Sequence, residues 1–272
     1  MPALPPSPVP QQEPHQHRQV AESFGSQAER YDRARPRYPA ALVERIVASS
    51  PGPDVLDVGC GTGIAARQFQ AAGCRVLGVD PDARMAELAR GHGIQVEVAT
   101  FEAWHPAGRA FDTVTAGQAW HWVDPAAGAA QAARVLRPGG RLAAFWNVFQ
   151  PPPEVAGAFS AVHRQVMPES VANFWARPGL DAYAGILARV ADGMRQTGAF
   201  SEPEQWQFDW EQGYTRDEWL DAVPTAGLSS QLPPATLQAL LTGTGAAIDA
   251  LGGSFTMHYA TVVVTATRPC AA

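Results

Sequence analysis

The first half of the chain alternates between short apolar runs and segments whose apolar residues recur with helical spacing. The apolar runs are rich in valine and leucine and predict strands at 55–58, 76–79, 96–98, 111–115 and 141–146. Helices are predicted between them, at 39–49, 64–72, 83–90 and 126–136. Strands that alternate with helices in this way form a parallel sheet with helices on both faces. The pattern therefore predicts an α/β fold with a doubly wound, Rossmann-like sheet.

The pattern changes after residue 150. Residues 154–200 and 215–250 have helical spacing, and two further strands are predicted, at 206–210 and 256–267. The simplest arrangement adds these two strands to the same sheet and uses the helical inserts as a lid over one edge. Because ligands bind outside the carboxyl ends of strands in such sheets, the lid is expected to cover the ligand-binding edge.

The N-terminal segment differs in composition from the rest of the chain. Residues 1–18 are rich in proline and glutamine and contain few residues that could join a hydrophobic core. Such a segment cannot bury enough apolar surface to offset the entropy that is lost on ordering. We therefore expect a disordered tail at 1–18 and a single domain at 19–272, with helical inserts near 154–200 and 215–250.

Composition narrows the class of protein. The 272 residues are 46% hydrophobic and carry a formal net charge of −6, and the 20 basic residues are scattered, which argues against a nucleic-acid partner. The cysteines, Cys60, Cys74 and Cys270, form no CxxC pair and predict neither a disulfide framework nor a metal site. Neither a membrane span nor a signal peptide is predicted. We expect a cytoplasmic protein, as a monomer or a homodimer.

Three glycines separate the first predicted strand from the helix that follows it: Gly59, Gly61 and Gly63. Glycines at this place let a ligand approach the backbone, while the N–H groups of the helix N-terminus remain available to it. The GxGxG spacing differs from the GxGxxG of dinucleotide-binding proteins. Asp80 ends the second strand, where a carboxylate can accept hydrogen bonds from both hydroxyls of a ribose. Together these residues predict a site for a nucleoside.

Four segments resemble the class I S-adenosylmethionine-dependent methyltransferases: VLDVGCGTG (55–63), VLGVDPDARM (76–85), FDTVTAGQAWHWV (111–123) and AARVLRPGGRLAAFWN (132–147). The segments AERYDRARPRYPAALVERI and QAWHWVD are similar to the small-molecule branch of that family, which includes trans-aconitate methyltransferase-like (methyltransferase type 11) enzymes. The resemblance implies a seven-stranded sheet whose last strand is antiparallel. It also implies S-adenosyl-L-methionine as the cofactor.

The resemblance further implies which residues would bind the cofactor. Gly59, Gly61 and Gly63 would line its methionine part, Asp57 would lie near its ammonium group, and Asp80 would hold its ribose.

Adenine recognition would differ from the family pattern. Thr100 stands where the family often has an acidic residue that contacts adenine, so the resemblance implies binding through backbone groups at Thr100 and Phe101 and packing against Pro81 and Met85. Tyr31 and Tyr38 resemble residues that fold over the cofactor, with Arg35 available for a carboxylate. The alternative for this N-terminal segment is a helix and turn that only pack.

Gln118 and His121 follow the fourth predicted strand and would lie beside the cofactor's sulfur. Methyl transfer from a sulfonium is an in-line displacement, in which alignment of the acceptor and exclusion of water supply most of the catalysis. His121 is the candidate general base, which a hydroxyl acceptor would need and a carboxylate acceptor would not. The alternative is a structural role, in which the imidazole is hydrogen-bonded within an aromatic cluster.

The sequence thus predicts an S-adenosylmethionine-dependent methyltransferase that acts on a small-molecule acceptor at oxygen, either a carboxylate or a hydroxyl. Two alternatives remain open. A nicotinamide-dependent oxidoreductase would share the nucleotide-binding sheet, and a non-catalytic S-adenosylmethionine-binding protein would keep the site without the chemistry.

Overall fold

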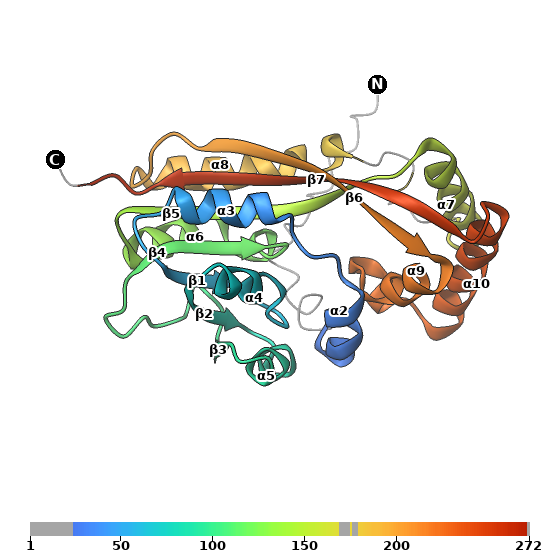
Figure 1. Cartoon of the computed structure of the whole chain (residues 1–272), viewed down its shortest axis with the longest axis horizontal. Helices are drawn as coiled ribbons and strands as arrows, with labels where there is room; N and C mark the ends of the chain where they lie inside the picture. Colours follow the sequence, from blue (N-terminus) through green and yellow to red (C-terminus); the bar gives the residue numbers. More distant parts are fainter. Residues whose placement is uncertain (1–23, 169–174, 176–178, 271–272) are drawn as a thin grey trace, which may run out of the picture.

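A single seven-stranded sheet runs through the molecule in the order β3-β2-β1-β4-β5-β7-β6 (Figure 1). The computed structural model describes residues 24–168, 175 and 179–270, so the predicted tail at 1–18 lies outside the described residues. β7 is antiparallel to its neighbours β5 and β6, and the other pairs are parallel. The strands are β1 Asp54–Val58, β2 Arg75–Asp80, β3 Gln95–Val98, β4 Phe111–Gly117, β5 Leu136–Gln150, β6 Glu204–Thr215 and β7 Ser254–Thr267. The predicted Rossmann-like sheet with an antiparallel last strand is confirmed.

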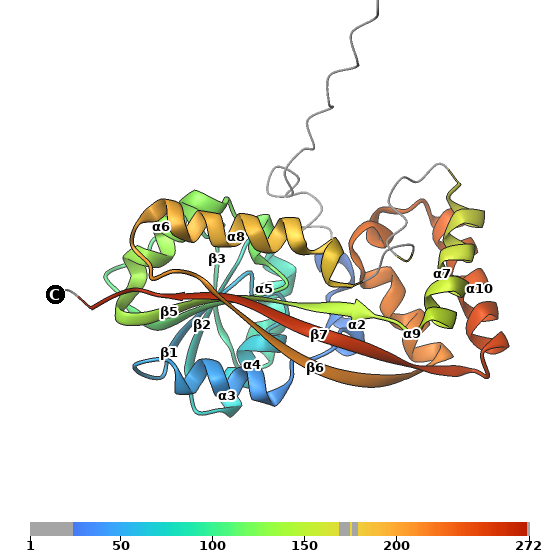
Figure 2. The ribbon, with the colours of Figure 1, turned by 90° about the horizontal axis from the view of Figure 1, so that it is seen from above.

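Helices cover both faces of the sheet (Figure 2). The face with α3 Ala40–Ala48, α4 Ile64–Ala71 and α5 Ala83–Gly91 buries one apolar cluster, and the face with α6 Pro125–Val135 and α8 Ala184–Thr197 buries another. Within the described ranges the 3₁₀ turns are η2 Phe24–Gln27, η3 Trp120–Trp122, η5 Leu180–Ala182, η6 Val223–Thr225 and η7 Gly227–Gln231. Among the described helices, none is both long and apolar enough to cross a membrane.

The central strands are buried because helices cover both of their faces. Every residue of β4 from Phe111 to Ala116 is buried, and so is β1 from Val55 to Val58. The two strands pair in register from Val55 with Thr113 to Asp57 with Thr115. Their carboxyl ends therefore open side by side at one edge of the sheet, next to the end of β2.

Three strands continue beyond that edge and carry a separate group of helices. β5 pairs with β4 only as far as Phe145 and then continues to Gln150, held by β7. β6 and β7 accompany it, and Figure 2 shows these strands reaching α7 Pro153–Val166, α9 Arg216–Ala222 and α10 Pro234–Ala250. α10 packs against both α7 and α9, over an apolar cluster of its own. These three helices form the lid.

The first predicted insert, 154–200, divides between two places. α7 belongs to the lid, but α8 packs along α6 on the face of the sheet and contacts β7. The expectation that the whole insert covers the ligand-binding edge therefore holds for α7 and not for α8. The reason is that α8 buries Leu187, Val190 and Met194, which complete the core beneath α6.

Candidate functional site

The loop between β1 and α4 is built around glycines with left-handed backbone angles. Gly59 has φ +63°, and a Cβ there would come within 2.5 Å of the Ala119 Cβ. Gly61 has φ +55°, and a Cβ there would meet nothing within 4 Å. Gly59 is therefore required for close packing of the loop on the end of β4, whereas Gly61 faces open space. A bound group can come close to the backbone at Gly61.

The carboxylate of Asp80 holds this loop from the end of β2. Its Oδ2 accepts a hydrogen bond from the Gly61 N–H at 2.7 Å, and its Oδ1 accepts one from the Asp82 N–H at 2.9 Å. Asp80 is only 6% exposed, and burial raises its pKa to about 6 against the effect of these two hydrogen bonds. Each carboxylate oxygen still has a lone pair for a ligand.

A cavity lies in front of Asp80, and we call it the outer cavity. It brings together nine of the predicted site residues: Tyr31, Gly59, Gly61, Asp80, Pro81, Met85, Thr100, Phe101 and Gln118. Its walls are mostly apolar, and the polar groups lie at the ends of β2, β3 and β4. A flat apolar ring with a polar substituent at one end matches this arrangement.

A second cavity, which we call the inner cavity, continues from the outer one past Gly59, Gly61 and Gln118. It is lined by Asp57, which is 1% exposed and whose Oδ1 accepts a hydrogen bond from the Thr115 hydroxyl at 3.0 Å. In the described part of the chain its Oδ2 is buried and accepts no hydrogen bond of ordinary geometry, although the backbone N–H of Ala66 lies close enough to lower the pKa of the carboxyl group. Burial raises the pKa of Asp57 to about 7, to which the neighbouring Asp80 also contributes. A buried carboxylate oxygen without a well-formed hydrogen bond fits a ligand that brings a cation.

Helix α2, Ala28–Ala34, closes both cavities from one side. Its Tyr31 lines the outer and the inner cavity. The helix is tied to the sheet domain by Asp32, which accepts a hydrogen bond from the Thr62 hydroxyl at 2.7 Å and pairs with Arg67 at 2.5 Å. It is tied to the lid by Arg30 and Arg33, which both pair with Asp221 of α9. α2 therefore links the glycine loop to the lid.

Gln118 has a backbone conformation that side chains rarely adopt. Its φ is +56°, at the end of β4, and its N–H donates to the Phe145 carbonyl at 2.8 Å. A non-glycine residue in the left-handed region costs free energy and often marks a functional position. Gln118 lines both cavities, which is where the sequence predicts it.

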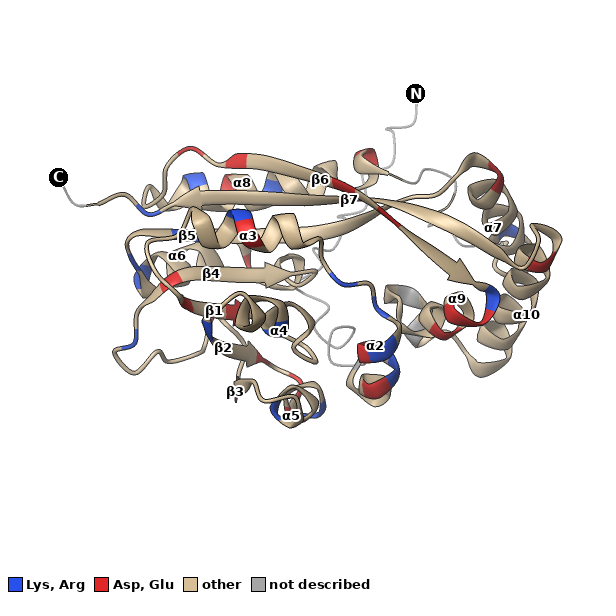
Figure 3. Ribbon diagram, viewed as in Figure 1, with Lys and Arg blue, Asp and Glu red and all other residues tan. Residues whose placement is uncertain are grey.

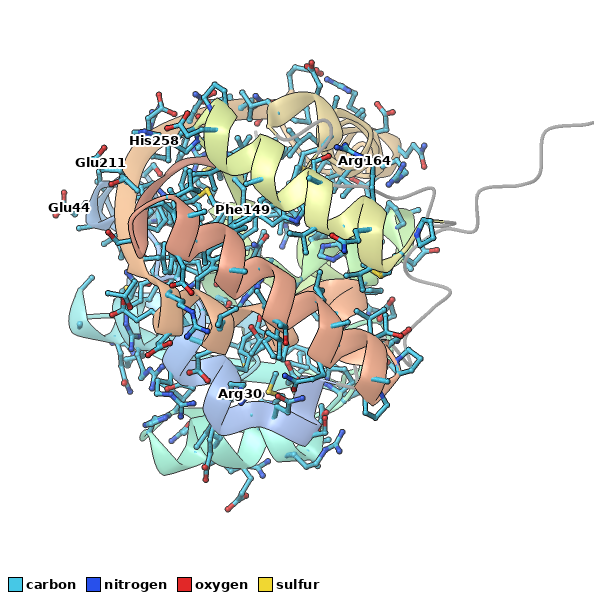
Figure 4. All side chains as sticks on the ribbon, turned by 90° about the vertical axis from the view of Figure 1, so that its right-hand side faces the viewer. Arg30, Glu44, Phe149, Arg164, Glu211 and His258 are labelled. Carbon is cyan, nitrogen blue, oxygen red and sulfur yellow. The ribbon has the colours of Figure 1, made fainter. Side chains whose placement is uncertain are left out.

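A third and larger cavity lies under the lid, and we call it the aromatic chamber. It has a volume of about 530 Å³ and lies between the extended ends of β5, β6 and β7 and the lid helices. Figure 4 views this end of the molecule and shows Phe149 between α7 and α10. The aromatic side chains that line it are Phe149, Phe159, Trp175, Tyr214, Trp219 and Tyr259. Arg35 and Pro36 line both the chamber and the inner cavity, so the two spaces adjoin.

Two predicted site residues lie elsewhere. Gly63 lines neither the outer nor the inner cavity: it precedes α4, and a Cβ there would approach Ile94 and Ala89, so this glycine serves helix packing. His121 lines none of the three cavities. Its Nδ1 accepts a hydrogen bond from the Trp146 indole at 3.1 Å, and burial lowers its pKa to about 4. The geometry corresponds to the structural alternative, and it does not bring a base to the acceptor.

Sequence reasoning missed several residues that line the site. Gly117 and Asn147 stand at or near the carboxyl ends of β4 and β5, and a search of every strand end would have found them. Glu102 lines the outer cavity two residues after Thr100, and it accepts a hydrogen bond from the Asp124 N–H at 3.0 Å. An acidic group is thus present near the position where the family pattern has one, but it is displaced along the chain.

Comparisons with known proteins agree with this geometry. The family described as "Methyltransferase domain" matches residues 56–144, which span β1 to β5. A malonyl-[acyl-carrier protein] O-methyltransferase of Enterobacter lignolyticus is 32% identical over 182 residues, which cover 63% of this chain and 70% of that protein. The chain is a class I S-adenosylmethionine-dependent methyltransferase of the type 11 kind. The nicotinamide-dependent alternative is therefore wrong. The non-catalytic alternative is tested by the activity measurement described below.

Two further comparisons extend the match. An uncharacterized methyltransferase of Mycobacterium tuberculosis strain H37Rv is 39% identical over 132 residues. These cover 48% of this chain and 54% of the mycobacterial protein, so the match spans about half of that relative. A solved structure from Anaeromyxobacter dehalogenans, assigned to the type II methyltransferases, has a TM-score of 0.58 at 26% identity. It covers 87% of this chain and 99% of the other, so the resemblance includes the lid as well as the sheet domain.

The cofactor of this methyltransferase is S-adenosyl-L-methionine. The residues present fit it on two observations of the structure. The unpartnered Oδ2 of Asp57 suits an ammonium group, and the open space at Gly61 suits a group that lies against the backbone. When bound, the cofactor supplies a methyl group on a positively charged sulfur.

Replacing His121 with asparagine should leave the methyltransferase active. We expect turnover within about twofold of the wild type, because the imidazole lines no cavity, and a loss of about 1 kcal/mol of stability from disturbed packing. Turnover is measured as S-adenosylhomocysteine formation with a metabolite extract as the source of acceptor. Stability is measured by thermal unfolding. A loss of roughly 10²–10⁴ in turnover with unchanged S-adenosylhomocysteine affinity would restore the general base.

Proposed function

We propose that this methyltransferase transfers a methyl group to an oxygen of a small molecule that binds in the aromatic chamber. The observation that carries the proposal is the continuity of the site: Arg35 and Pro36 line the inner cavity on one side and the chamber on the other. Asn147 lines the inner cavity and Phe149 the chamber, and two residues of a strand span about 6.6–6.8 Å. An acceptor in the chamber can therefore reach a cofactor in the inner cavity.

The cofactor is proposed to lie across both smaller cavities. Asp80 accepts hydrogen bonds from the ribose hydroxyls, and Asp57 receives the ammonium group. Gly61 allows the methionine part to lie against the loop backbone, and Gly59 lets the loop pack on the end of β4. Adenine lies among Pro81, Met85, Thr100 and Phe101, where apolar side chains cover its faces. Tyr31 of α2 closes the site, and Gln118 marks the junction between its two halves.

Two further observations support a small-molecule acceptor and transfer to oxygen. Acidic and basic residues are interspersed over the ribbon (Figure 3), which is unlike the continuous basic surface that nucleic-acid binding requires. The relatives from Enterobacter lignolyticus and, over a shorter match, Hahella chejuensis are named O-methyltransferases. Catalysis then consists of aligning the acceptor and excluding water, which the lid and α2 do together.

Binding of the cofactor product should depend on pH through Asp57. The site needs the ionised carboxylate for an ammonium ligand, and burial raises its pKa to about 7. We therefore expect the affinity for S-adenosylhomocysteine to rise by about tenfold or more between pH 6 and 8 and then to level off. The Asp57→Asn variant should bind weakly, with only a roughly twofold change over this range from Asp80, whose pKa is about 6.

The raised pKa of Asp57 also predicts how the stability of the ligand-free protein depends on pH. Because Asp57 holds its proton to higher pH when folded than when unfolded, this group makes the protein less stable as the pH rises from about 4 to 7. Calorimetric titrations between pH 6 and 8 measure the affinity, and denaturant unfolding between pH 4 and 7 measures the stability. A wild-type affinity that does not change between pH 6 and 8 would show that the ammonium group binds elsewhere.

The proposed function is tested by incubation with S-adenosylmethionine that carries a ¹³C-labelled methyl group, together with a metabolite extract. Mass spectrometry then locates the label. We expect labelled small molecules whose methyl group is bound to oxygen, as esters or ethers. Label found only on nitrogen, on protein or on nucleic acid would overturn the proposal.

A further inference from the structure

The chamber meets the inner cavity at one cation, Arg35. Its guanidinium lines both spaces, and it lies 5.3 Å from the centroid of the Tyr31 ring. Over the ranges that the structure describes, no hydrogen bond or ion pair joins this guanidinium to a partner. A cation that is largely removed from water and lacks a counter-charge is unfavourable unless a ligand supplies an anion.

The chamber offers an anion hydroxyl donors as well as the Arg35 cation. The hydroxyls of Tyr214 and Tyr259 are 2.6 Å apart, and both residues line the chamber. Since only one of the two hydroxyl protons can lie between them, the other remains available to a ligand.

The backbone that follows Arg35 is held in position before any ligand binds. The Asn147 side-chain amide donates to the Arg37 carbonyl at 3.2 Å. Gln68 and the backbone of Tyr38 exchange two hydrogen bonds, of 3.0 and 2.7 Å. The segment that carries Arg35 is thus attached to β5 and to α4. The backbone here therefore needs no further ordering when the Arg35 side chain binds a ligand.

The rest of the chamber is mostly apolar and, among its described lining residues, offers no counter-charge for a cationic substrate. Phe149, Phe159, Trp175 and Trp219 contact one another, with ring centroids 5.2–6.0 Å apart. Among its described lining residues there is no aspartate or glutamate. An amine would have to lose its hydration without gaining a counter-charge, whereas an acid would find Arg35.

We propose that the acceptor is a hydrophobic carboxylic acid, held with its carboxylate at Arg35 and its apolar body among the aromatic side chains of the chamber. This rests on the proposed function and names its substrate class. One carboxylate oxygen forms a bond to the methyl carbon while the bond from that carbon to sulfur breaks. The sulfur keeps the electron pair, and the products are a methyl ester and S-adenosylhomocysteine. No proton moves, which agrees with the position of His121 outside the cavities.

Three probes of equal chain length test the head group: decanoate, decan-1-ol and decylamine at pH 8. Calorimetry on the full chain, with S-adenosylhomocysteine present, measures each affinity. Decanoate is expected to bind about tenfold or more tighter than decan-1-ol, and decylamine more weakly than either. With S-adenosylmethionine instead, mass spectrometry should find methyl decanoate. Equal affinity for decanoate and decan-1-ol would overturn the proposal, and this comparison needs no variant.

A pair of variants tests Arg35 itself. Arg35→Gln is expected to remove the preference for decanoate over decan-1-ol, and to weaken decanoate binding more than it weakens S-adenosylhomocysteine binding. Arg37→Gln is the matched control, because it removes one exposed positive charge two residues away and should change neither affinity. If Arg35→Gln instead weakens S-adenosylhomocysteine and keeps the preference for decanoate, Arg35 binds the carboxylate of the cofactor and the proposal is wrong.

Chain length tests the apolar part of the chamber. Affinity should rise about three- to fourfold for each methylene added from hexanoate to decanoate, as burial of apolar surface requires. Equal affinities for hexanoate and decanoate would contradict binding of the acceptor in the chamber.

Failure of this inference can be told from failure of the proposed function. If the ¹³C label appears on oxygen of polar metabolites while decanoate does not bind, only the substrate class is wrong. If S-adenosylhomocysteine binds and no small molecule is labelled at oxygen, the proposed function fails, and the inference with it.

Discussion

Replacing Gly61 with valine is expected to abolish measurable binding of S-adenosylhomocysteine while the protein still folds. The residue has φ +55°, and a left-handed conformation costs a side-chain residue about 1–2 kcal/mol. The larger effect is steric, because the space beside Gly61 is open in the free protein and is the space in which we propose that the methionine part lies. Isothermal titration measures the affinity, and thermal unfolding confirms the fold.

The control for this variant separates strain from obstruction. Gly73 follows α4, has φ +89° and also has nothing within 4 Å of an added Cβ, but it lines none of the three cavities. Gly73→Val should therefore lose stability of the same order and keep its affinity for S-adenosylhomocysteine. If Gly61→Val binds as well as Gly73→Val, the glycine loop does not contact the cofactor.

Replacing Asp80 with alanine is expected to weaken S-adenosylhomocysteine binding by about 1–3 kcal/mol, roughly 5- to 150-fold. Two losses contribute. The ribose loses charge-assisted hydrogen bonds, and the Gly61 N–H loses the acceptor that holds the loop at 2.7 Å. The second loss follows from the structure and makes Asp80 a loop anchor as well as a ligand. Titration calorimetry on the folded variant measures the effect.

Asp82 supplies the matched control for Asp80. It is 6% exposed as well, but its side chain caps α5 by accepting a hydrogen bond from the Arg84 N–H, and it lines neither the outer nor the inner cavity. Asp82→Ala should cost about 1 kcal/mol of stability and leave the affinity unchanged. Equal affinities in Asp80→Ala and the wild type would mean that Asp80 only shapes the turn.

The sheet and the glycine loop could be predicted because their signals are local. Strands β1 and β4 are rich in buried apolar residues because both faces are covered, and the loop glycines adjoin β1 in the sequence. Asp80 could be predicted for the same reason, since it ends β2 directly. These assignments need only the pattern within one βαβ unit.

The lid and the chamber depend on contacts between distant segments. Phe149 and Tyr259 lie side by side only because β5 and β7 extend together beyond the sheet, and no local sequence pattern predicts that extension. The division of the first insert between α7 and α8 is likewise decided by which core each helix completes. His121 and Gly63 both follow a strand, as the sequence predicts. The His121 imidazole, however, turns to Trp146, and a Cβ at Gly63 would point at Ile94 and Ala89, so neither residue faces a cavity.

The account is tested most directly by a crystal structure of the complex with S-adenosylhomocysteine. It predicts the ribose hydroxyls at the carboxylate of Asp80 and the ammonium group within about 3 Å of the free Oδ2 of Asp57. The sulfur should face the junction at Arg35, with the aromatic chamber open to it. An ammonium group bound away from Asp57, or a sulfur that faces away from the chamber, would contradict the account.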